Sequence, residues 1–240
     1  MSQRNDLEGV LLIDKPEGMT SHDVVDKVRH KLKMKRIGHA GTLDPNATGL
    51  LIILVGKATK LSQFLMGLDK TYEGVISLGI ETTTQDVEGE VVEEKDVPEL
   101  SEDQLKDYMK EFIGDQYQTP PMFSAKKIDG VPLYKMARKG KTVEREPRFI
   151  HISSFKLDKW ESPDIEFTLS CSKGTYVRTV ANDLGRKIGC GGYLKELRRT
   201  DIERFRIEDS IELESFEDLS IDEIKSWLIP PYQAVPSNVT

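Results

Sequence analysis

One short segment of the 240-residue chain places an acidic side chain in a setting suited to chemistry. It covers residues 38–50 and reads Gly-His-Ala-Gly-Thr-Leu-Asp-Pro-Asn-Ala-Thr-Gly-Leu. Gly41 and Gly49 permit backbone conformations closed to other residues, while Pro45 keeps the residue before it out of the helical region. We therefore expect Asp44 to lie in a tight, stiff loop, with His39 on the loop's other arm. Taken alone, the segment fits equally well an Asx turn started by Asp44.

The sequence around this loop predicts the elements that must hold it. Residues 50–55 are apolar without alternation, which indicates a strand buried on both faces or a short buried helix. Residues 9–14 predict a buried strand, and a helix N-capped by Ser21 follows a turn. Further predicted elements are strands at 72–80, 149–157 and 165–171, an acidic hairpin at 81–100, a helix at 101–113 with a capping box, and a helix from beyond Gly174 to Gly189.

The composition is that of an ordinary globular protein, with 38% hydrophobic residues. We predict a single domain with two lobes over residues 1–240, with a core at about 9–210. The chain has no apolar stretch of about 18 residues, and its first residues lack a signal-peptide pattern, so we expect a cytoplasmic protein. Cys171 and Cys190 lack CxxC spacing and the four histidines are scattered, which indicates neither a disulfide framework nor a zinc site.

The net charge of −7 argues against a nucleic-acid partner until it is divided along the chain. Residues 71–118 carry 14 acidic and 3 basic side chains, and residues 207–240 carry 8 and 1. The remaining body is basic, and local potential steers a polyanion more than net charge does. A solvated basic face is the alternative. We expect residues 71–118 to face away from any nucleic acid and residues 207–240 to form a peripheral helix and an acidic tail.

Two basic segments are candidates for RNA contact. Residues 119–148 combine 8 basic side chains with several prolines, and Phe123 and Tyr134 offer stacking surfaces for unpaired bases. An ordinary surface loop is the alternative there. The cluster at 31–36 suits either a helix C-terminus, where cations oppose the dipole, or phosphate contact. Residues 49–57 lack the spacing of a phosphate-binding P-loop, which excludes that class of ATPase.

These segments in their order resemble the bacterial tRNA pseudouridine synthase B (TruB) family. The resemblance rests on residues 14–21 (Asp-Lys-Pro-Glu-Gly-Met-Thr-Ser), 38–50, Tyr72 with its strand, 120–148, 174–179 (Gly-Thr-Tyr-Val-Arg-Thr) and 197–199 (Leu-Arg-Arg). It covers roughly residues 9–210. It implies an α+β fold, a mixed and mostly antiparallel sheet flanked by helices with a central active-site cleft. It also implies isomerisation of uridine 55 in the T loop of tRNA to pseudouridine, without a metal or organic cofactor.

The resemblance assigns roles to eight residues of this chain. Asp44 matches the catalytic aspartate, Arg178 its arginine partner, and Tyr72 the active-site tyrosine. His39 matches the histidine that replaces the extruded uridine, since the target base must leave its stack. Tyr176 and Leu197 match residues that line the uracil pocket, and Lys15 and Lys60 match basic positions with phosphate-binding or structural roles.

The resemblance leaves the chemical route of Asp44 open. It could attack the sugar at C1′, add to the base at C6, or assist elimination to a glycal, and we favour the two routes at the sugar. We expect the C-terminal PUA domain of many family members to be absent, so that affinity depends more on residues 119–148. Alternative functions are a synthase acting on other RNA uridines and a tRNA-binding folding chaperone with secondary catalysis. We expect a monomer.

Overall fold

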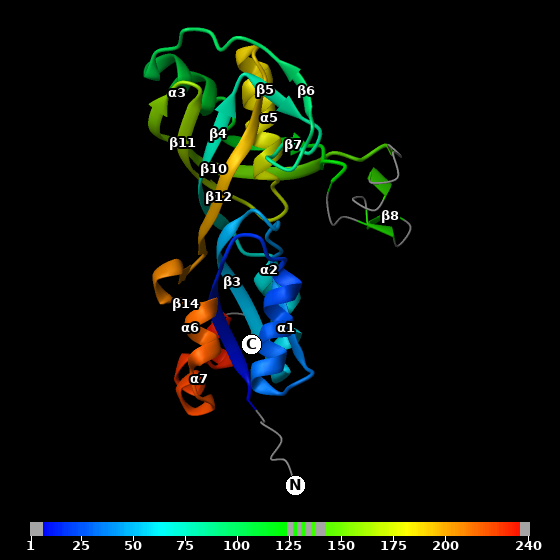
Figure 1. The fold of residues 1–240 in the computed structure, drawn as a ribbon, viewed down its shortest axis with the longest axis vertical. Helices are drawn as coiled ribbons and strands as arrows, with labels where there is room; N and C mark the ends of the chain where they lie inside the picture. Colours follow the sequence, from blue (N-terminus) through cyan, green and yellow to red (C-terminus); the bar gives the residue numbers. More distant parts are fainter. Residues whose placement is uncertain (1–6, 124–126, 129–130, 133–135, 138–142, 236–240) are drawn as a thin grey trace. The chain divides into compact units, whose positions relative to one another are not determined.

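The chain forms two compact units in the computed structural model, which describes residues 7–123, 127–128, 131–132, 136–137 and 143–235. Unit 1 comprises residues 1–72 and 197–240, and unit 2 comprises residues 73–196. Two strands contain the boundaries between the units: β4 (Lys70–Leu78) and β12 (Gly192–Ile202). In Figure 1 the colours follow the sequence, and unit 1 combines the blue N-terminal part of the chain with the orange C-terminal part.

Unit 1 is built on a mixed sheet whose order is β14-β1-β3-β12. β1 (Gly9–Lys15) pairs antiparallel with β3 (Thr48–Val55), and β3 pairs parallel with β12 through Arg198↔Thr48 and Arg199↔Gly49. The shorter strands of this unit are β2 (Ile37–Ala40), β13 (Phe205–Arg206) and β14 (Ile211–Glu212). Every residue of β3 except Thr48 is buried, so the strand alternative for residues 50–55 is confirmed.

Helices cover both faces of this sheet, which explains why its central strands lack alternation. Leu51 and Ile53 pack on one side, with α1 and the C-terminal helices, while Leu50 and Ile52 pack on the other. The helical segments of unit 1 are α1 (Ser21–Leu32), η1 (Gly56–Leu61), α2 (Ser62–Met66), η2 (Ile207–Asp209), α6 (Leu213–Asp218), α7 (Ile221–Trp227) and α8 (Pro231–Ala234).

Unit 2 is a mostly antiparallel arrangement in the order β12-β4-β11-β10-β7. An aromatic core joins its strands, since Phe155 contacts Phe112 and Phe167 edge-to-face at 6.3 and 5.6 Å between ring centroids. Its further elements are β5 (Ile80–Thr82), β6 (Val91–Glu94), α3 (Glu102–Lys110), β7 (Gly114–Gln118), β8 (Lys127–Ile128), β9 (Val131–Pro132), β10 (Arg148–Glu161), β11 (Asp164–Cys171) and α5 (Val177–Ile188).

Most predicted elements of unit 2 are present, although α3 ends at Lys110 rather than at 113 and β10 extends to Glu161 rather than to 157. The capping box of α3 joins Ser101 and Gln104 as predicted, and Gly189 ends α5 in the left-handed conformation with φ +102°. β5 pairs with β6, which confirms the hairpin in the acidic segment. The mixed, mostly antiparallel sheet flanked by helices is the fold class that the sequence predicted.

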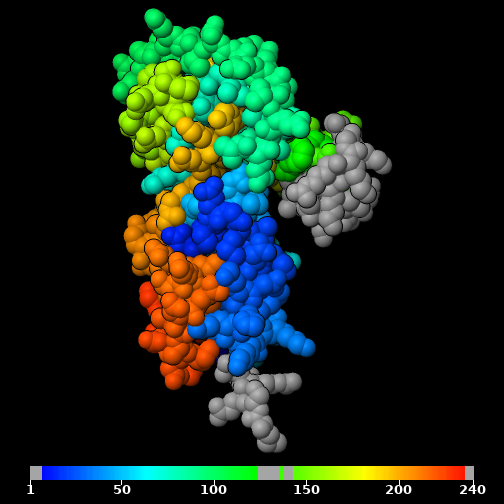
Figure 2. All heavy atoms as spheres, in the orientation of Figure 1, coloured from blue at the N-terminus to red at the C-terminus, as the bar shows by residue number. Residues whose placement is uncertain are grey.

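Two expectations for unit 1 are wrong. The N-cap of α1 is Thr20, which forms a capping box with Asp23, and Ser21 is the first helical residue. The acidic C-terminal segment is also more than a peripheral helix and a tail. Figure 2 shows it against the N-terminal segment in unit 1, where Phe216 and Ile224 are fully buried and Ile229 exchanges backbone hydrogen bonds with Val10. Its acidic residues are interspersed with apolar residues that pack inward. A count of charges along the sequence does not reveal these apolar residues.

Candidate active site

The Asp44 loop presents an exposed aspartate between buried neighbours. Leu43 and Ala47 are 4% and 3% exposed, whereas the Asp44 residue is exposed to solvent. The Ala47 backbone N–H donates to the Asp44 carbonyl at 3.1 Å and closes a turn over Pro45 and Asn46. Buried side chains on both sides therefore hold the backbone, and the carboxylate projects from a fixed position.

Helix α1 anchors the N-terminal side of this loop. The Ser21 hydroxyl accepts a hydrogen bond from the Leu43 N–H at 2.9 Å, and its oxygen lies 3.2 Å from the Leu43 carbonyl. Both residues are buried, so this hydroxyl satisfies a backbone group that water does not reach. Because Thr20 caps the helix, Ser21 is available for this contact.

Lys15 anchors the C-terminal side. Its side chain is fully buried, and its ammonium donates to the carbonyls of Pro16, Met19 and Pro45 at 2.8, 2.7 and 3.2 Å. Burial lowers the pKa of Lys15 to about 8, against the opposing effect of the nearby Asp44 carboxylate. Of the two roles expected for Lys15, these contacts fit the structural one, since a buried ammonium with three carbonyl partners is not presented to a phosphate.

His39 lies on β2, next to the loop in sequence, and is half-buried. Burial lowers the pKa of this imidazole, and the positive charge of Arg199 acts in the same direction. The ring is therefore neutral at pH 7. Its buried Nδ1 atom has no hydrogen-bond partner. A neutral ring suits a stacking contact better than an ion pair.

The other predicted residues of unit 1 differ in exposure. Tyr72 on β4 and Leu197 on β12 are half-buried, while Lys60 in η1 is exposed. The Tyr72 hydroxyl interacts with the guanidinium of Arg199, a residue to which the sequence assigned no role. Lys60 belongs to a group of exposed cations in unit 1.

Unit 2 holds Arg178 in the first turn of α5, and a carboxylate from the acidic segment is its buried partner. Arg178 Nη1 donates to Asp86 Oδ2 at 3.1 Å, and the two side chains are 7% and 9% exposed. Asp86 is itself held by the Glu88 N–H at 3.1 Å and by the Thr84 hydroxyl. This part of the acidic segment is thus built into the candidate site, contrary to the expectation of a solvated face.

The sequence contained a signal for Asp86 that was missed. Residues 82–86 read Thr-Thr-Thr-Gln-Asp, and hydroxyl and carboxylate side chains this dense are typical of a turn that binds its own polar atoms. Thr82, Thr84 and Asp86 are all buried, at 7 to 8% exposure. A buried carboxylate requires a cationic partner, and Arg178 is that partner.

Tyr176 is positioned from its backbone. The side-chain amide of Gln118 accepts from the Tyr176 N–H at 2.8 Å and donates to the Tyr176 carbonyl at 3.1 Å. This double contact holds the residue at the start of α5, with the Arg178 guanidinium 6.0 Å from the centroid of its ring. Unit 2 therefore brings two predicted site residues, Tyr176 and Arg178, together with Asp86.

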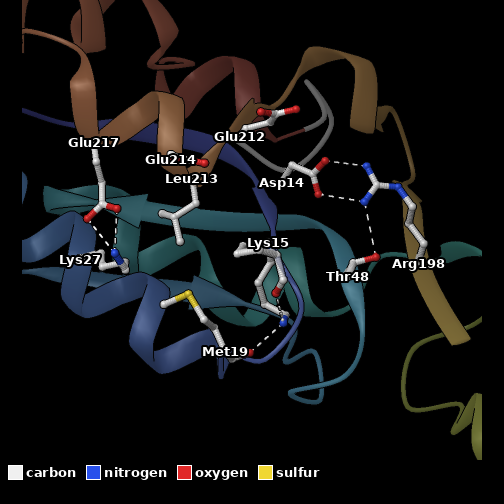
Figure 3. Close-up of a pocket in the computed structure, with 11 residues that line it drawn as sticks. Asp14, Lys15, Met19, Lys27, Thr48, Arg198, Glu212, Leu213, Glu214 and Glu217 are labelled. Atoms are coloured by element: carbon white, nitrogen blue, oxygen red, sulfur yellow. Dashed lines mark hydrogen bonds and ion pairs between the residues drawn. The ribbon is translucent and has the colours of Figure 1, made fainter.

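A pocket of about 470 Å³ lies beside the loop in unit 1, but its charges are already matched. Figure 3 shows the Asp14 carboxylate facing the Arg198 guanidinium, with Nη1···Oδ1 and Nη2···Oδ2 distances of 3.1 and 2.5 Å. At the other side of the pocket, Lys27 pairs with Glu217 at 2.7 Å. Glu212 and Glu214 add further acid to the lining, so the pocket is unsuited to phosphate.

The basic segment 119–148 is described only in part. Phe123 is half-buried, and Arg145 donates to the Pro120 carbonyl at 3.1 Å, whereas Tyr134 lies outside the described residues. Among the residues that are described, no group of three or more His, Cys, Asp or Glu side chains is arranged to hold a metal ion. No helix in that part of the chain is both long and apolar enough to cross a membrane.

Comparison with known protein families shows to which family the chain belongs. The profile of the TruB family pseudouridylate synthase N-terminal domain matches residues 29–177, and that of the tRNA pseudouridylate synthase B C-terminal domain matches residues 178–230. The chain belongs to the TruB family. This confirms the predicted family and the prediction that the chain is a pseudouridine synthase, an isomerase that modifies RNA.

Individual relatives support the same assignment. The chain is 58% identical over 236 residues to a protein of Opitutus terrae named tRNA pseudouridine synthase B, covering 98% of each. It is 48% identical to the protein of that name from Aquifex aeolicus, covering 93% of this chain and 78% of the relative. In the crystal structure of a Cbf5-Nop10-Gar1 complex, one chain aligns with a TM-score of 0.75 at 28% identity. That alignment covers 95% of this chain and 61% of the length of the other, and it confirms the predicted fold class.

Proposed function

We propose that this protein isomerises uridine 55 in the T stem-loop of tRNA to pseudouridine, with Asp44 as the essential catalytic residue. The observation that carries the proposal is the exposed carboxylate of Asp44 on a loop that buried contacts hold from both sides, in a chain of the TruB family. The tRNA substrate is suggested by the names of the relatives. A fixed, solvent-facing carboxylate is what nucleophilic attack on a bound substrate requires.

A cluster of exposed cations in unit 1 supports RNA binding. Arg36 Nε donates to the Thr59 hydroxyl at 2.9 Å, and this contact joins the segment before β2 to η1. The two segments together present the exposed side chains of Lys33, Lys35, Arg36, Lys57 and Lys60, with Glu8 pairing Lys57 at 3.4 Å. Five cations and one acid form a surface suited to the phosphate backbone. The basic residues at 31–36 would therefore bind phosphate in addition to stabilising the C-terminus of α1.

An exposed aromatic pair in unit 2 supports contact with unpaired bases. Tyr117 and Phe149 face each other on β7 and β10 with ring centroids 5.8 Å apart, and they are 74% and 59% exposed. These strands lead into and out of the basic segment 119–148. Aromatic rings with this exposure suit stacking on the splayed bases of an RNA loop.

The proposed reaction conserves every atom of the nucleotide. The N1–C1′ bond breaks and uracil leaves with the bonding electron pair, while the Asp44 carboxylate compensates the electron-deficient sugar carbon. The base turns, its C5 forms the bond to C1′, the proton on C5 departs, and N1 takes up a proton.

The other site residues would bind the base and position the aspartate. Tyr72 and Tyr176 would stack on the uracil and Leu197 would line its pocket. Arg178, held by Asp86, would keep Asp44 charged and aimed, while the neutral His39 replaces the extruded uridine.

The test uses unmodified tRNA and a matched transcript with cytidine at position 55, incubated with the full chain and then mapped for pseudouridine. Modification of the first RNA at position 55 alone is the expected result. Modification of both RNAs at other positions would contradict the proposed target and favour a synthase for other uridines. Binding and refolding of tRNA without modification would favour the chaperone alternative.

A kinetic isotope effect distinguishes the two routes at the sugar. Elimination to a glycal removes the C2′ proton, so a 2′-deuterated uridine would react several-fold more slowly by that route. Direct attack of Asp44 on C1′ leaves the C2′–H bond intact and gives no such slowing. The monomeric state and the cytoplasmic location remain predictions, for which sedimentation and cell fractionation are the tests.

A further inference from the structure

Arg199 on β12 is the largest fully buried side chain among the described residues, with 1% exposure. Burial lowers the pKa of its guanidinium, which shows that the environment opposes the charge. A buried guanidinium persists only where carbonyl or hydroxyl oxygens accept its donors, because its desolvation costs several kcal/mol. The partners of Arg199 therefore show what this residue holds in place.

Two of these partners bracket the catalytic loop. Arg199 Nη2 donates to the Gly41 carbonyl at 3.1 Å, and Nε donates to the Leu50 carbonyl at 2.8 Å. Gly41 precedes Asp44 and Leu50 follows it, so a single planar group fixes the backbone on both sides of the aspartate. The rigid fork of arginine suits this double contact, which the single ammonium of a lysine cannot reproduce.

The third partner is the Tyr72 hydroxyl. A tyrosine oxygen that receives a guanidinium N–H is held in one direction. Arg199 thus touches two parts of the candidate active site that lie 28 residues apart, the Asp44 loop and Tyr72.

The backbone of Arg199 is fixed as firmly as its side chain. Arg199 pairs with Gly49 in the parallel register of β12 and β3. A Cβ atom at Gly49 would lie 2.3 Å from the Arg199 carbonyl oxygen, so this approach requires glycine, which also adopts φ +101°. Gly49, at the loop end of β3, therefore allows the close approach that places the backbone of Arg199 beside the Asp44 loop.

We propose that Arg199 is a positioning residue for the isomerisation, which holds the Asp44 loop and the Tyr72 hydroxyl in their reactive arrangement. The inference rests on the proposed function. It assigns Arg199 no contact with RNA, because the side chain is fully buried. Replacing Arg199 should slow the chemical step and leave tRNA affinity unchanged.

Arg198 offers a matched control on the same strand. It is the preceding arginine, it points to the other side of the strand, and it forms an ion pair with Asp14 and a contact with Thr48. Replacing either arginine removes one cation and its partners from β12. Of the two, Arg199 binds backbone carbonyls on both sides of Asp44, at Gly41 and Leu50, whereas Arg198 reaches only the Thr48 side chain in this segment.

The experiment compares the wild type with Arg199→Lys, Arg199→Gln and Arg198→Gln under single-turnover conditions on unmodified tRNA. We expect Arg199→Gln to lower the saturated rate by about 100-fold, since small misplacement of reacting groups has that effect. Arg199→Lys should recover part of this rate, and Arg198→Gln should stay within about threefold of the wild type. The dissociation constant for tRNA should change less than twofold in all three, and circular dichroism checks that each is folded.

Two further measurements separate positioning from loss of structure. Amide hydrogen exchange at residues 41–50 should accelerate in Arg199→Lys and not in Arg198→Gln, a result that needs no activity. Adding Tyr72→Phe to Arg199→Lys should cost less than Tyr72→Phe costs in the wild type, because the two residues act together. If Arg199→Gln does not fold, Arg199→Lys carries both comparisons.

Wild-type rate in a folded Arg199→Lys, an effect confined to tRNA affinity, or fully multiplicative double-variant effects would each overturn the inference. A wild type that makes no pseudouridine would instead overturn the proposed function. In that case the exchange measurement still decides whether Arg199 orders the loop.

Discussion

The two units hold their functional side chains by different means. In unit 1, the buried cations Lys15 and Arg199 donate to backbone carbonyls around Asp44, and the carboxylate itself faces solvent. In unit 2, Arg178 is buried together with the carboxylate of Asp86. Unit 1 thus uses buried cations to order the backbone around an exposed acid, whereas the acid of unit 2 is buried against one arginine. The comparison predicts that losses in unit 1 should mainly affect rate, whereas loss of the buried pair in unit 2 should lower stability as well as rate.

The largest effect is expected for the exposed acid of unit 1, Asp44. Asp44→Asn removes the ionised carboxylate and keeps the size of the side chain, so pseudouridine formation should fall on the order of 10³-fold or more. Affinity for a T stem-loop should stay nearly unchanged because the cation cluster is intact. Product mapping and filter binding measure the two quantities. Retained turnover in Asp44→Asn would remove Asp44 from its proposed role.

The buried pair of unit 2 should dominate stability. Asp86→Asn leaves the Arg178 guanidinium without its charged partner in a buried site, which should lower the free energy of unfolding by about 3 kcal/mol. Asp107→Asn is the control, since Asp107 and Lys110 are 74% and 69% exposed and solvent screens such a pair, so its loss should change stability little. Urea unfolding measures both. Equal losses in the two variants would show that the buried pair contributes no more than a surface pair.

A smaller effect tests whether the loop of unit 1 depends on α1. Ser21→Ala leaves the buried Leu43 N–H without its acceptor, which should cost about 1 to 2 kcal/mol and loosen the loop. The saturated rate should fall about tenfold. Thr20→Ala removes the N-cap of the same helix at a cost of about 1 kcal/mol but does not touch Leu43, so its rate should stay near that of the wild type. A similar rate in both variants would detach Ser21 from the loop's function.

The smallest effect on rate is expected for Lys15, whose lowered pKa should appear instead as a pH dependence of stability. Its pKa falls from 10.5 to about 8 on folding, so the unfolded chain binds more protons between these values. The free energy of unfolding therefore gains a contribution that rises with pH from about 8 upward, by at most about 1.4 kcal/mol per pH unit. Urea unfolding at pH 7.5 and 9.5 should show this rise in the wild type and a smaller one in Lys15→Met. Parallel behaviour of the two proteins would exclude the lowered pKa.

The local sequence determined much of the fold and, in the candidate site, the Asp44 loop of unit 1. Glycine and proline around Asp44 predicted a stiff loop because φ restrictions act within a few residues, and the apolar run at 50–55 indicated burial on both faces. Helix termini at Ser101 and Gly189 followed from caps of equally short range. The order of the motifs indicated the family, which the matched profiles confirmed.

Only the tertiary structure decided the partners of the buried charges. Asp86 and Arg178 are 92 residues apart, and Arg199 reaches Gly41 across 158, so no local pattern predicts either contact. Lys15 and Arg199 are basic residues in a chain expected to use such residues for RNA, yet packing buries both against carbonyls. The acidic C-terminal segment likewise enters the core of unit 1. Sequence specifies which groups carry charge, but burial decides whether that charge meets solvent or orders the backbone, and burial depends on segments that only the fold brings together.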